Sequence, residues 1–420
     1  MARRPRIAFF DFADVFEDFY QHYCASQHAT RWSDTGNHAF LRLLQRDVGD
    51  VVWYVLSLAP ECEREHHSKL GCEVVFVRSS AIHRLLWKAF YLPTQAWRWR
   101  RLFRAYATLA GYLAPMSLAL IATLRRNRPD VIFVQDYASG KFDVLWLLAR
   151  MLGARFIAYH SGSQPERYLG RCVRRLTLPR TDRLIMSGEK EAQRLRESFA
   201  VPADRLKTVL TPLDTMAYRP LARPQACTTI DFPVHRRYVL FVGRLDDRIK
   251  RISLLIRAFA AVAAQFDDVD LLIAGDGDDR GDLSALALKL CGERCHFLGW
   301  VSGDTKKAAL YSAAEFLVLP SVREGFPTVV AESMACGLPV LATDVGGVSE
   351  MVRDDDSGYL LRGDIEVTVK QRMAEVLRNA PLRERLSQGA RRMAEARVSE
   401  AVVSDQLREC FGFARSQDAA

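Results

Sequence analysis

The sequence lacks the features that mark a small secreted or fibrous protein. Its nine cysteines are scattered and odd in number, so no disulfide framework is visible among the 420 residues, and a chain of this length buries enough apolar surface without one. No tandem repeat or low-complexity tract occurs. A secretory leader is not expected, because Asp11 and Asp14 interrupt the short apolar run near the start. We expect a reduced, cytoplasmic protein, and association with the inner face of a membrane stays open.

A large excess of one charge is also absent. The 59 lysines and arginines face 50 acidic residues, for a net charge of +9, which does not by itself predict a nucleic-acid-binding protein. Hydrophobic residues make up 49% of the chain and charged residues 26%, as in ordinary globular proteins. The length favours two large domains.

Long uncharged runs are rare, and residues 105–124 (Ala105 to Leu124) form the one that could cross a bilayer. Polar residues and Pro115 interrupt it, so a buried or surface-lying helix is favoured over a membrane span. Just before it, residues 97–104 (Trp97 to Arg104) interleave arginine with tryptophan. That pattern suits peripheral contact with an anionic membrane. A solvated helix face with inward tryptophans is the alternative. Nucleic acid is disfavoured, because no nucleic-acid-binding module is recognisable.

Short apolar segments alternate with helical patterns in both halves of the chain. The predicted strands are residues 6–10, 51–58, 74–77, 131–134 and 156–159, and then 238–242, 271–274, 296–298, 316–319 and 340–342. Such alternation predicts an α/β fold with a doubly wound parallel sheet in each half. Residues 212–234 contain four prolines and little periodicity, which is typical of a linker. We therefore predict domains at 1–215 and 216–390 with a ligand cleft between them, and a helical segment at 391–420 that packs back on the first domain.

The most informative stretch runs from Ser321 to Gly347, SVREGFPTVVAESMACGLPVLATDVGG. Pro327 suits the first position of a helix and Gly337 the residue after its end. Glu324 precedes this helix and Glu332 lies on it, about 7 Å along its axis. Two carboxylates offset in this way can hold two hydroxyl-bearing groups of one extended ligand. The free amides at the helix start can meet an anion between them.

This stretch resembles the E-x7-E signature of the retaining glycosyltransferases of family GT4, which have the GT-B fold of two Rossmann-like domains. The resemblance extends in the expected order over FVGRLDDRIKR (241–251), LLIAGDGDD (271–279), HFLGWVS (296–302) and GGVSEMVRDDDSGYLL (346–361). It implies an enzyme that transfers a sugar from a nucleotide-diphosphate sugar to a hydroxyl acceptor, without a metal or other cofactor. The acceptor, which the first domain would bind, is lipid-linked, a polysaccharide or a small-molecule glycan.

The resemblance also implies a role for each matching residue. Arg244 and Lys250 would hold the donor pyrophosphate and stabilise the charge on the leaving nucleotide. Glu324 would contact hydroxyls of the donor sugar, and Glu332 those of the ribose. His160, at the end of the strand over 156–159, would contact the donor sugar or phosphate and completes the catalytic set. Gly299, Trp300 and Val301 would line the pocket for the base. The remaining predicted donor contacts are Gly36, Gly243, Gly325, Phe326, Pro327, Thr328 and Val329.

Departures and alternatives accompany these assignments. Gly36 stands alone where the family commonly has a glycine pair, and Arg251 replaces the glycine that usually follows Lys250. Asp276-Gly277-Asp278 is predicted to be a turn rather than a metal site. Cys291, Cys295 and His296 lack the second half of a zinc site. A nucleotide-sugar epimerase of GT-B fold and a non-catalytic nucleotide-sugar binder remain as other functions. Residues 11–34 and 160–171 are the predicted acceptor loops.

Overall fold

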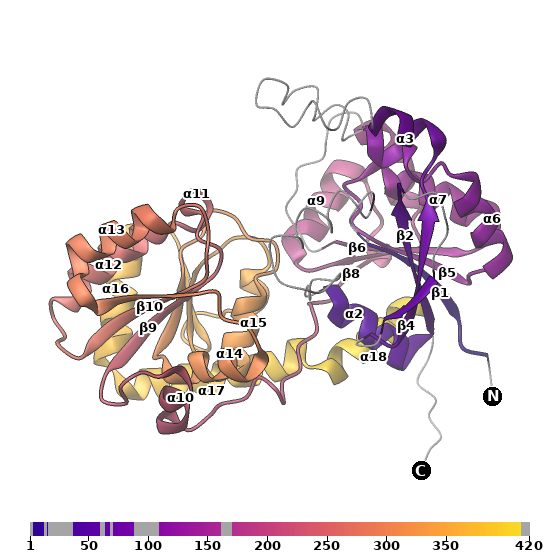
Figure 1. Ribbon diagram of the computed structural model, residues 1–420. Coiled ribbons are helices and arrows are strands. Elements are labelled where there is room, and N and C mark those ends of the chain that lie inside the picture. Colours follow the sequence, from indigo (N-terminus) through magenta and orange to yellow (C-terminus); the bar gives the residue numbers. More distant parts are fainter. Residues whose placement is uncertain are drawn as a thin grey trace, which may run out of the picture. The chain divides into compact units, whose positions relative to one another are not determined.

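The computed structural model describes residues 3–11, 15, 37–58, 64–67, 70–87, 109–160 and 170–412. The chain divides into two compact units. The first unit comprises Met1–Val209 and Ser404–Ala420, and the second comprises Leu210–Val403. Each unit is built around its own β-sheet with helices on both faces (Figure 1).

The first unit contains an eight-stranded sheet in the order β3-β4-β2-β1-β5-β6-β7-β8. All neighbouring strands are parallel except β3, which pairs antiparallel with β4 at one edge. This confirms the doubly wound sheet and every strand predicted for this half. The strands are β1 Arg6–Phe10, β2 Asp50–Ser57, β3 Arg64–His67, β4 Cys72–Arg78, β5 Val131–Gln135, β6 Arg155–His160, β7 Arg183–Met186 and β8 Leu206–Thr208.

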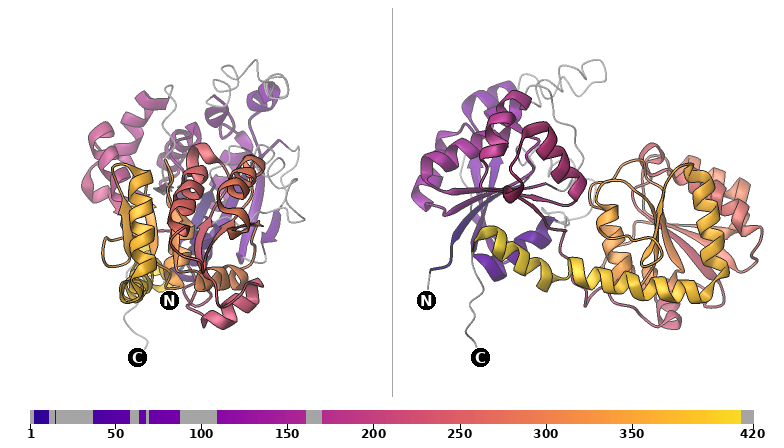
Figure 2. Two further views of the ribbon diagram at one scale, coloured as in Figure 1. Left: turned by 90° about the vertical axis from the view of Figure 1, so that its left-hand side faces the viewer. Right: turned by 180° about the vertical axis from the view of Figure 1, so that it is seen from behind.

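Helices cover both faces of this sheet (Figure 2). On one face, apolar residues of α6, α7 and α9 pack into a single core with the strands. On the other face, Phe411 of the last helix, α18, contacts Phe133 of β5 with ring centroids 5.4 Å apart. The helices are α2 Asn37–Leu43, α3 Ala81–Leu86, α6 Leu118–Asn127, α7 Gly140–Leu152, α8 Arg171–Thr177, α9 Glu189–Phe199 and α18 Glu400–Phe411.

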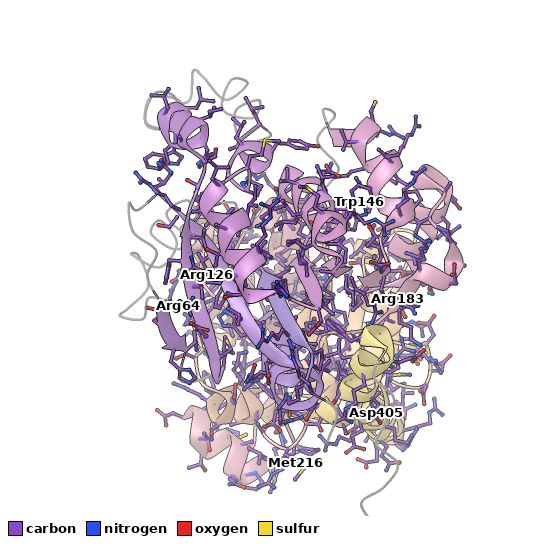
Figure 3. The ribbon with its side chains drawn as sticks, turned by 90° about the vertical axis from the view of Figure 1, so that its right-hand side faces the viewer. Arg64, Arg126, Trp146, Arg183, Met216 and Asp405 are labelled. Carbon is purple, nitrogen blue, oxygen red and sulfur yellow. The ribbon has the colours of Figure 1, made fainter. Side chains whose placement is uncertain are left out.

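The uncharged segment over residues 105–124 is not one continuous helix. Residues 109–113 are helical, a turn follows at 114–115, and Ser117 then caps α6 by accepting a hydrogen bond from the Leu120 amide. Leu120 and Leu124 are fully buried in the core, whereas Arg126 lies on the exposed side of α6 (Figure 3). No helix in the described ranges is both long and apolar enough to span a membrane. Residues 97–104 lie outside the described residues.

The second unit contains a six-stranded, fully parallel sheet in the order β11-β10-β9-β12-β13-β14. All strands predicted for this half are present, and β14 is additional. Their bounds are β9 Arg237–Val242, β10 Val269–Ala274, β11 Cys295–Gly299, β12 Phe316–Leu319, β13 Val340–Thr343 and β14 Gly358–Leu361. The helices are α10 Arg223–Ile230, α11 Asp247–Lys250, α12 Ile252–Ala263, α13 Arg280–Cys291, α14 Asp304–Ala313, α15 Thr328–Ala335, α16 Ile365–Arg378 and α17 Ala380–Val398.

Residues 212–234, the predicted linker, lie within the second unit and contain a helix. This segment contains α10, which packs against α14, and its Ala226 and Cys227 are fully buried. Pro224 lies in the first turn of α10, where a missing N–H removes no helical hydrogen bond. The chain passes from the first unit to the second at Leu210 and returns at Ser404. Residue 391, where the C-terminal segment was predicted to begin, lies inside α17.

Asp270 of β10 is the most strongly perturbed carboxylate in the described part of the second unit. It is 6% exposed, and Arg236 Nε donates a hydrogen bond to it at 2.9 Å. Burial acts to raise the pKa of Asp270, but the neighbouring His296 and Arg236 side chains outweigh it and hold the pKa at about 2. The ionised form is therefore strongly preferred in the folded protein.

This shift predicts a pH dependence of stability. Because the folded pKa of Asp270 lies below its usual 3.8, its carboxylate stabilises the fold above about pH 4, and this contribution is lost as the pH falls from about 4 to about 2. We expect Asp270→Asn to lower the melting temperature most at neutral pH, and the gap from wild type to close toward pH 2. Circular dichroism melts measure this, with the exposed neighbour Asp267→Asn as control. A gap that stays constant with pH would refute the assignment.

Candidate active site

The predicted donor-binding residues lie at the carboxyl ends of the central strands of the second sheet. Strands β9 and β12 are neighbours, and the chain proceeds outward from β9 to β11 on one side and from β12 to β14 on the other. Open parallel sheets bind ligands at such a reversal point. Arg244 and Lys250 follow β9, and Glu324 follows β12.

Lys250 and Glu324 form a short ion pair across these two strand ends. Lys250 Nζ donates to Glu324 Oε1 at 2.6 Å, and the two side chains are 18% and 8% exposed. The Val322 amide donates to the Ile249 carbonyl at 2.7 Å, which joins the two loops. Arg244 is exposed, and its side chain makes no hydrogen bond or ion pair with the described residues. The structure therefore brings Lys250 and Glu324 together and leaves Arg244 available to a ligand.

Glycines allow the loops after β9 and β10 to touch through their backbones. A Cβ on Gly275, where φ is +138°, would lie 1.9 Å from the Gly243 carbonyl oxygen. The Leu245 amide donates to the Asp276 carbonyl at 3.0 Å. Asp276 Oδ1 accepts from the Gly277 amide at 2.8 Å, and a turn follows at 278–279, where the Arg280 amide donates to the Gly277 carbonyl at 3.2 Å. Across the described ranges, no group of three or more His, Cys, Asp or Glu side chains could hold a metal ion.

Glu332 lies on α15 and is held by two side chains of α14. It is 7% exposed; Lys307 Nζ donates to Oε1 at 2.8 Å and the Tyr311 hydroxyl donates to Oε2 at 2.7 Å. Lys307 Nζ also lies 3.3 Å from the Tyr218 hydroxyl, which donates to Asp304 at 2.8 Å. Sequence reasoning missed Lys307, Tyr311 and Tyr218. Lys307 and Tyr311 are four residues apart and so share one helix face, but this spacing alone does not connect them with Glu332.

The two tyrosines are hydrogen-bond donors in this cluster. Burial raises the pKa of Tyr311, and the neighbouring Glu332 carboxylate raises it further. The pKa of Tyr218 is raised by the same two causes. Each tyrosine therefore keeps its proton, and the Glu332 side chain retains lone pairs that can accept hydrogen bonds from ligand hydroxyls.

Gly346 follows β13 and lies against the backbone of the loop that carries Glu324. At its φ of +54°, a Cβ would lie 2.2 Å from the Glu324 carbonyl oxygen and 2.4 Å from that of Gly325. The Gly347 amide donates to the Gly325 carbonyl at 2.8 Å. On the other side, Phe326 is 9% exposed and packs into the core of the second unit. Pro327 then precedes α15, which begins with Thr328 and Val329.

The residues predicted to line a base pocket follow β11, which β10 separates from β9. Gly299 has a φ of +67°, and its carbonyl accepts from the Gly275 amide at 2.7 Å. Trp300 is 68% exposed, and Val301 is half-buried. Their role in base binding stays a prediction.

Cys291, Cys295 and His296 belong to no group of three or more possible metal ligands in the part of the chain that the structure describes. Cys291 donates to the Ile256 carbonyl at 3.8 Å, and His296 Nε2 lies 3.5 Å from Asp270. Burial raises the pKa of the Cys295 thiol to about 12.

The backbone conformation of Arg251 explains why glycine is usual at this position. The residue links α11 to α12 with φ +51° and ψ +45°, a left-handed conformation that costs a side-chain-bearing residue about 1 kcal/mol or more. The preceding residue, Lys250, is paired with Glu324.

We expect Arg251→Gly to raise the free energy of unfolding of the second unit by about 1 kcal/mol, because glycine adopts this conformation without strain. Arg251→Ala is the matched control, since it removes the same side chain but keeps the strain. Urea denaturation of both variants measures the difference. Equal stability of the two variants would show that the backbone conformation is not the cause.

In the first unit, His160 lies at the carboxyl end of β6 and is 4% exposed. Its Nδ1 is 2.9 Å from Asp136 Oδ1, and its ring centroid is 4.4 Å from that of Tyr137. Asp136 and Tyr137 directly follow β5, the neighbouring strand. Gly36, residues 161–169 and most of the predicted acceptor loop at 11–34 lie outside the described residues.

Two doubly wound parallel sheets define the GT-B class of fold, and solved structures of this class resemble the whole chain. A sucrose-phosphate synthase from Thermosynechococcus elongatus has a TM-score of 0.72 at 19% identity, over 97% of this chain and 98% of that one. Anabaena HepE, in complex with UDP and glucose, has a TM-score of 0.68 at 14% identity, over 97% of this chain and 100% of that one.

Sequence families match both halves of the chain. Residues 38–216 match the family described as Glycosyltransferase Family 4, and residues 229–393 match Glycosyl transferases group 1. Both models describe glycosyltransferases of the GT4 type, and the chain belongs to this family. A D-inositol 3-phosphate glycosyltransferase of Salinispora tropica is 32% identical over 276 residues, which are 62% of this chain and 56% of that relative. The chain thus spans little more than half the length of this curated relative.

Proposed function

We propose that this protein transfers a sugar from a nucleotide-diphosphate sugar to a hydroxyl acceptor, with retention of the anomeric configuration. The Lys250–Glu324 pair carries the proposal. A cation and a carboxylate held together at the reversal point of a parallel sheet suit a ligand in which a diphosphate adjoins a hydroxyl-rich sugar. Family membership and the UDP bound to HepE support the same donor class.

The donor is proposed to lie along the carboxyl edge of the second sheet. Arg244 and Lys250 contact the diphosphate, Glu324 accepts hydrogen bonds from the sugar hydroxyls, and Glu332 accepts them from the ribose. The free amides at the start of α15, near Thr328 and Val329, add partial positive charge. Because Lys307 and Tyr311 already bind Glu332, its carboxylate is oriented before the donor arrives.

In the proposed reaction, the acceptor hydroxyl oxygen bonds to the anomeric carbon on the face from which the nucleotide leaves. The bond from that carbon to the diphosphate oxygen breaks, and the electron pair goes to the leaving phosphate. The hydroxyl proton passes to the same phosphate. Lys250 and Arg244 stabilise the negative charge that develops there, so we propose that no metal ion or other cofactor is required.

The acceptor is proposed to be a hydroxyl-bearing lipid-linked, polysaccharide or small-molecule glycan. For a lipid-linked acceptor, the arginines and tryptophans of residues 97–104 would contact an anionic membrane. Co-sedimentation with phosphatidylglycerol vesicles tests that contact. Protein that stays in the supernatant would remove it from the proposal.

A thermal-shift panel of nucleoside diphosphates and nucleotide sugars tests the proposal. A ligand at about 100 times its dissociation constant stabilises the fold by about 2.7 kcal/mol, so the correct donor should raise the melting temperature clearly. Product analysis of that donor with and without acceptor then separates transfer from epimerisation. Absence of any shift across the panel contradicts the proposal. Binding without any product would favour a non-catalytic binder.

A further inference from the structure

The residue after β5, Asp136, has a backbone conformation that is uncommon for a residue with a side chain. Asp136 has a φ of +76°, in the left-handed region that residues with side chains rarely adopt, although aspartate tolerates it better than most. Conformations of this kind persist where surrounding interactions over-determine them, and they concentrate at functional sites. Asp136 is therefore a candidate functional residue.

One carboxylate oxygen of Asp136 lies within hydrogen-bonding distance of two nitrogen atoms. Oδ1 accepts from the Ala138 amide at 2.7 Å and lies 2.9 Å from His160 Nδ1. The Asp136 amide donates to the Tyr159 carbonyl at 2.7 Å, which ties the end of β5 to β6. Asp136 makes these three contacts in its positive-φ conformation.

Tyr137 restrains the imidazole from its face. Its ring centroid is 4.4 Å from that of His160 at an interplanar angle of 44°, and Tyr137 is 1% exposed. The Tyr137 hydroxyl accepts a hydrogen bond from Arg194 Nη2 at 2.7 Å. His160 is thus held by its edge and by its face, so its orientation is fixed before a substrate binds.

The charge of Asp136 decides which nitrogen of His160 is presented. Burial acts to raise the pKa of Asp136, but the hydrogen bonds from His160 and Ala138 and the charge of Lys141 lower it overall. An ionised carboxylate only accepts hydrogen bonds, so Nδ1 must carry the proton. In the neutral imidazole, Nε2 then has the lone pair, and it makes no hydrogen bond with the described residues.

We propose that Asp136 is a positioning residue that holds His160 as the Nδ1–H tautomer and presents Nε2 to a hydroxyl of the substrate. The part that concerns substrate rests on the proposed function, whereas the tautomer does not. The competing interpretation is that Asp136 only closes the turn through the Ala138 amide.

Two substitutions separate these roles. Glycine adopts a φ of +76° without strain, so Asp136→Gly removes the carboxylate and should leave the melting temperature near that of wild type. Asparagine keeps an acceptor oxygen and removes the charge. We expect Asp136→Gly to lower turnover about 100-fold and Asp136→Asn about 10-fold, measured as release of nucleoside diphosphate from the donor that stabilises the wild type. Asp231→Gly is the matched control: Asp231 also has a positive φ, +60°, and we expect wild-type turnover.

A double-mutant cycle with His160→Ala shows whether Asp136 acts through His160. If it does, adding Asp136→Gly to His160→Ala lowers turnover little further. Nitrogen NMR of labelled histidine reads the tautomer directly, and we expect Nδ1–H in the wild type and loss of that preference in Asp136→Gly.

Three results would overturn the proposal: an Nε2–H tautomer in the wild type, independent effects of the two substitutions, or an Asp136→Gly variant that is less stable yet turns over normally. If the wild type itself releases no nucleoside diphosphate and binds no nucleotide sugar, the proposed function fails instead. The NMR measurement still decides the role of Asp136 in that case.

Discussion

Replacing Gly346 by alanine is expected to abolish measurable donor binding and to lower the free energy of unfolding of the second unit by about 3 kcal/mol. The added Cβ would lie 2.2 Å from the Glu324 carbonyl oxygen and 2.4 Å from that of Gly325, closer than any van der Waals contact. These backbone atoms must move, and Glu324 moves with them. Calorimetric titration of the donor and urea denaturation measure the two effects.

Gly363→Ala is the matched control for this prediction. Gly363 also has a positive φ, +73°, but a Cβ there would meet nothing within 4 Å. The Gly363→Ala variant therefore pays only the cost of a positive φ, about 1 kcal/mol, and does not displace the loop that carries Glu324. If the two alanine variants bind donor equally well, the close approach of Gly346 to the Glu324 loop has no functional importance.

Glu324→Gln is expected to lower turnover about 1000-fold in a folded protein. The glutamine amide lacks the negative charge that pairs with Lys250, and it is a weaker acceptor of hydrogen bonds from the sugar hydroxyls than the carboxylate is. Lys250→Ala should lower turnover similarly. It should also reduce stability, since it leaves the 8%-exposed Glu324 side chain without a partner. Release of nucleoside diphosphate and thermal melts measure these changes.

The control for charge removal is Glu366→Gln. Glu366 pairs with Lys370 at 2.7 Å on the exposed face of α16, with the side chains 45% and 36% exposed. Such a surface pair contributes little, so turnover should be unchanged. Wild-type turnover by Glu324→Gln would remove Glu324 from the proposed mechanism.

The sequence predicted the second sheet well because its strands are buried on both faces. Segments such as 238–242 and 271–274 are almost wholly apolar, and such runs between helical patterns are read as parallel strands. β3, with the sequence REHH, has no apolar pattern and exists through its antiparallel pairing with β4. Four prolines suggested a linker over 212–234, yet Pro224 occupies the helix position that tolerates proline.

The candidate site was predictable in its residue types and not in its contacts. Lys250 and Glu324 were assigned separately from their motifs, but a distance of 2.6 Å between residues 74 positions apart depends on the order of strands in the sheet. Lys307 and Tyr311 carry no motif, and only the packing of α14 on α15 places them at Glu332. The positive φ of Asp136 likewise has no sequence signal.

A crystal structure of the full chain, soaked with the nucleotide sugar that gives the largest thermal shift, tests the central claim most directly. We expect the diphosphate against Lys250 and Arg244, the ribose hydroxyls on Glu332 and the sugar on Glu324. Density for the nucleotide sugar at any other place, with these four side chains untouched, would contradict it.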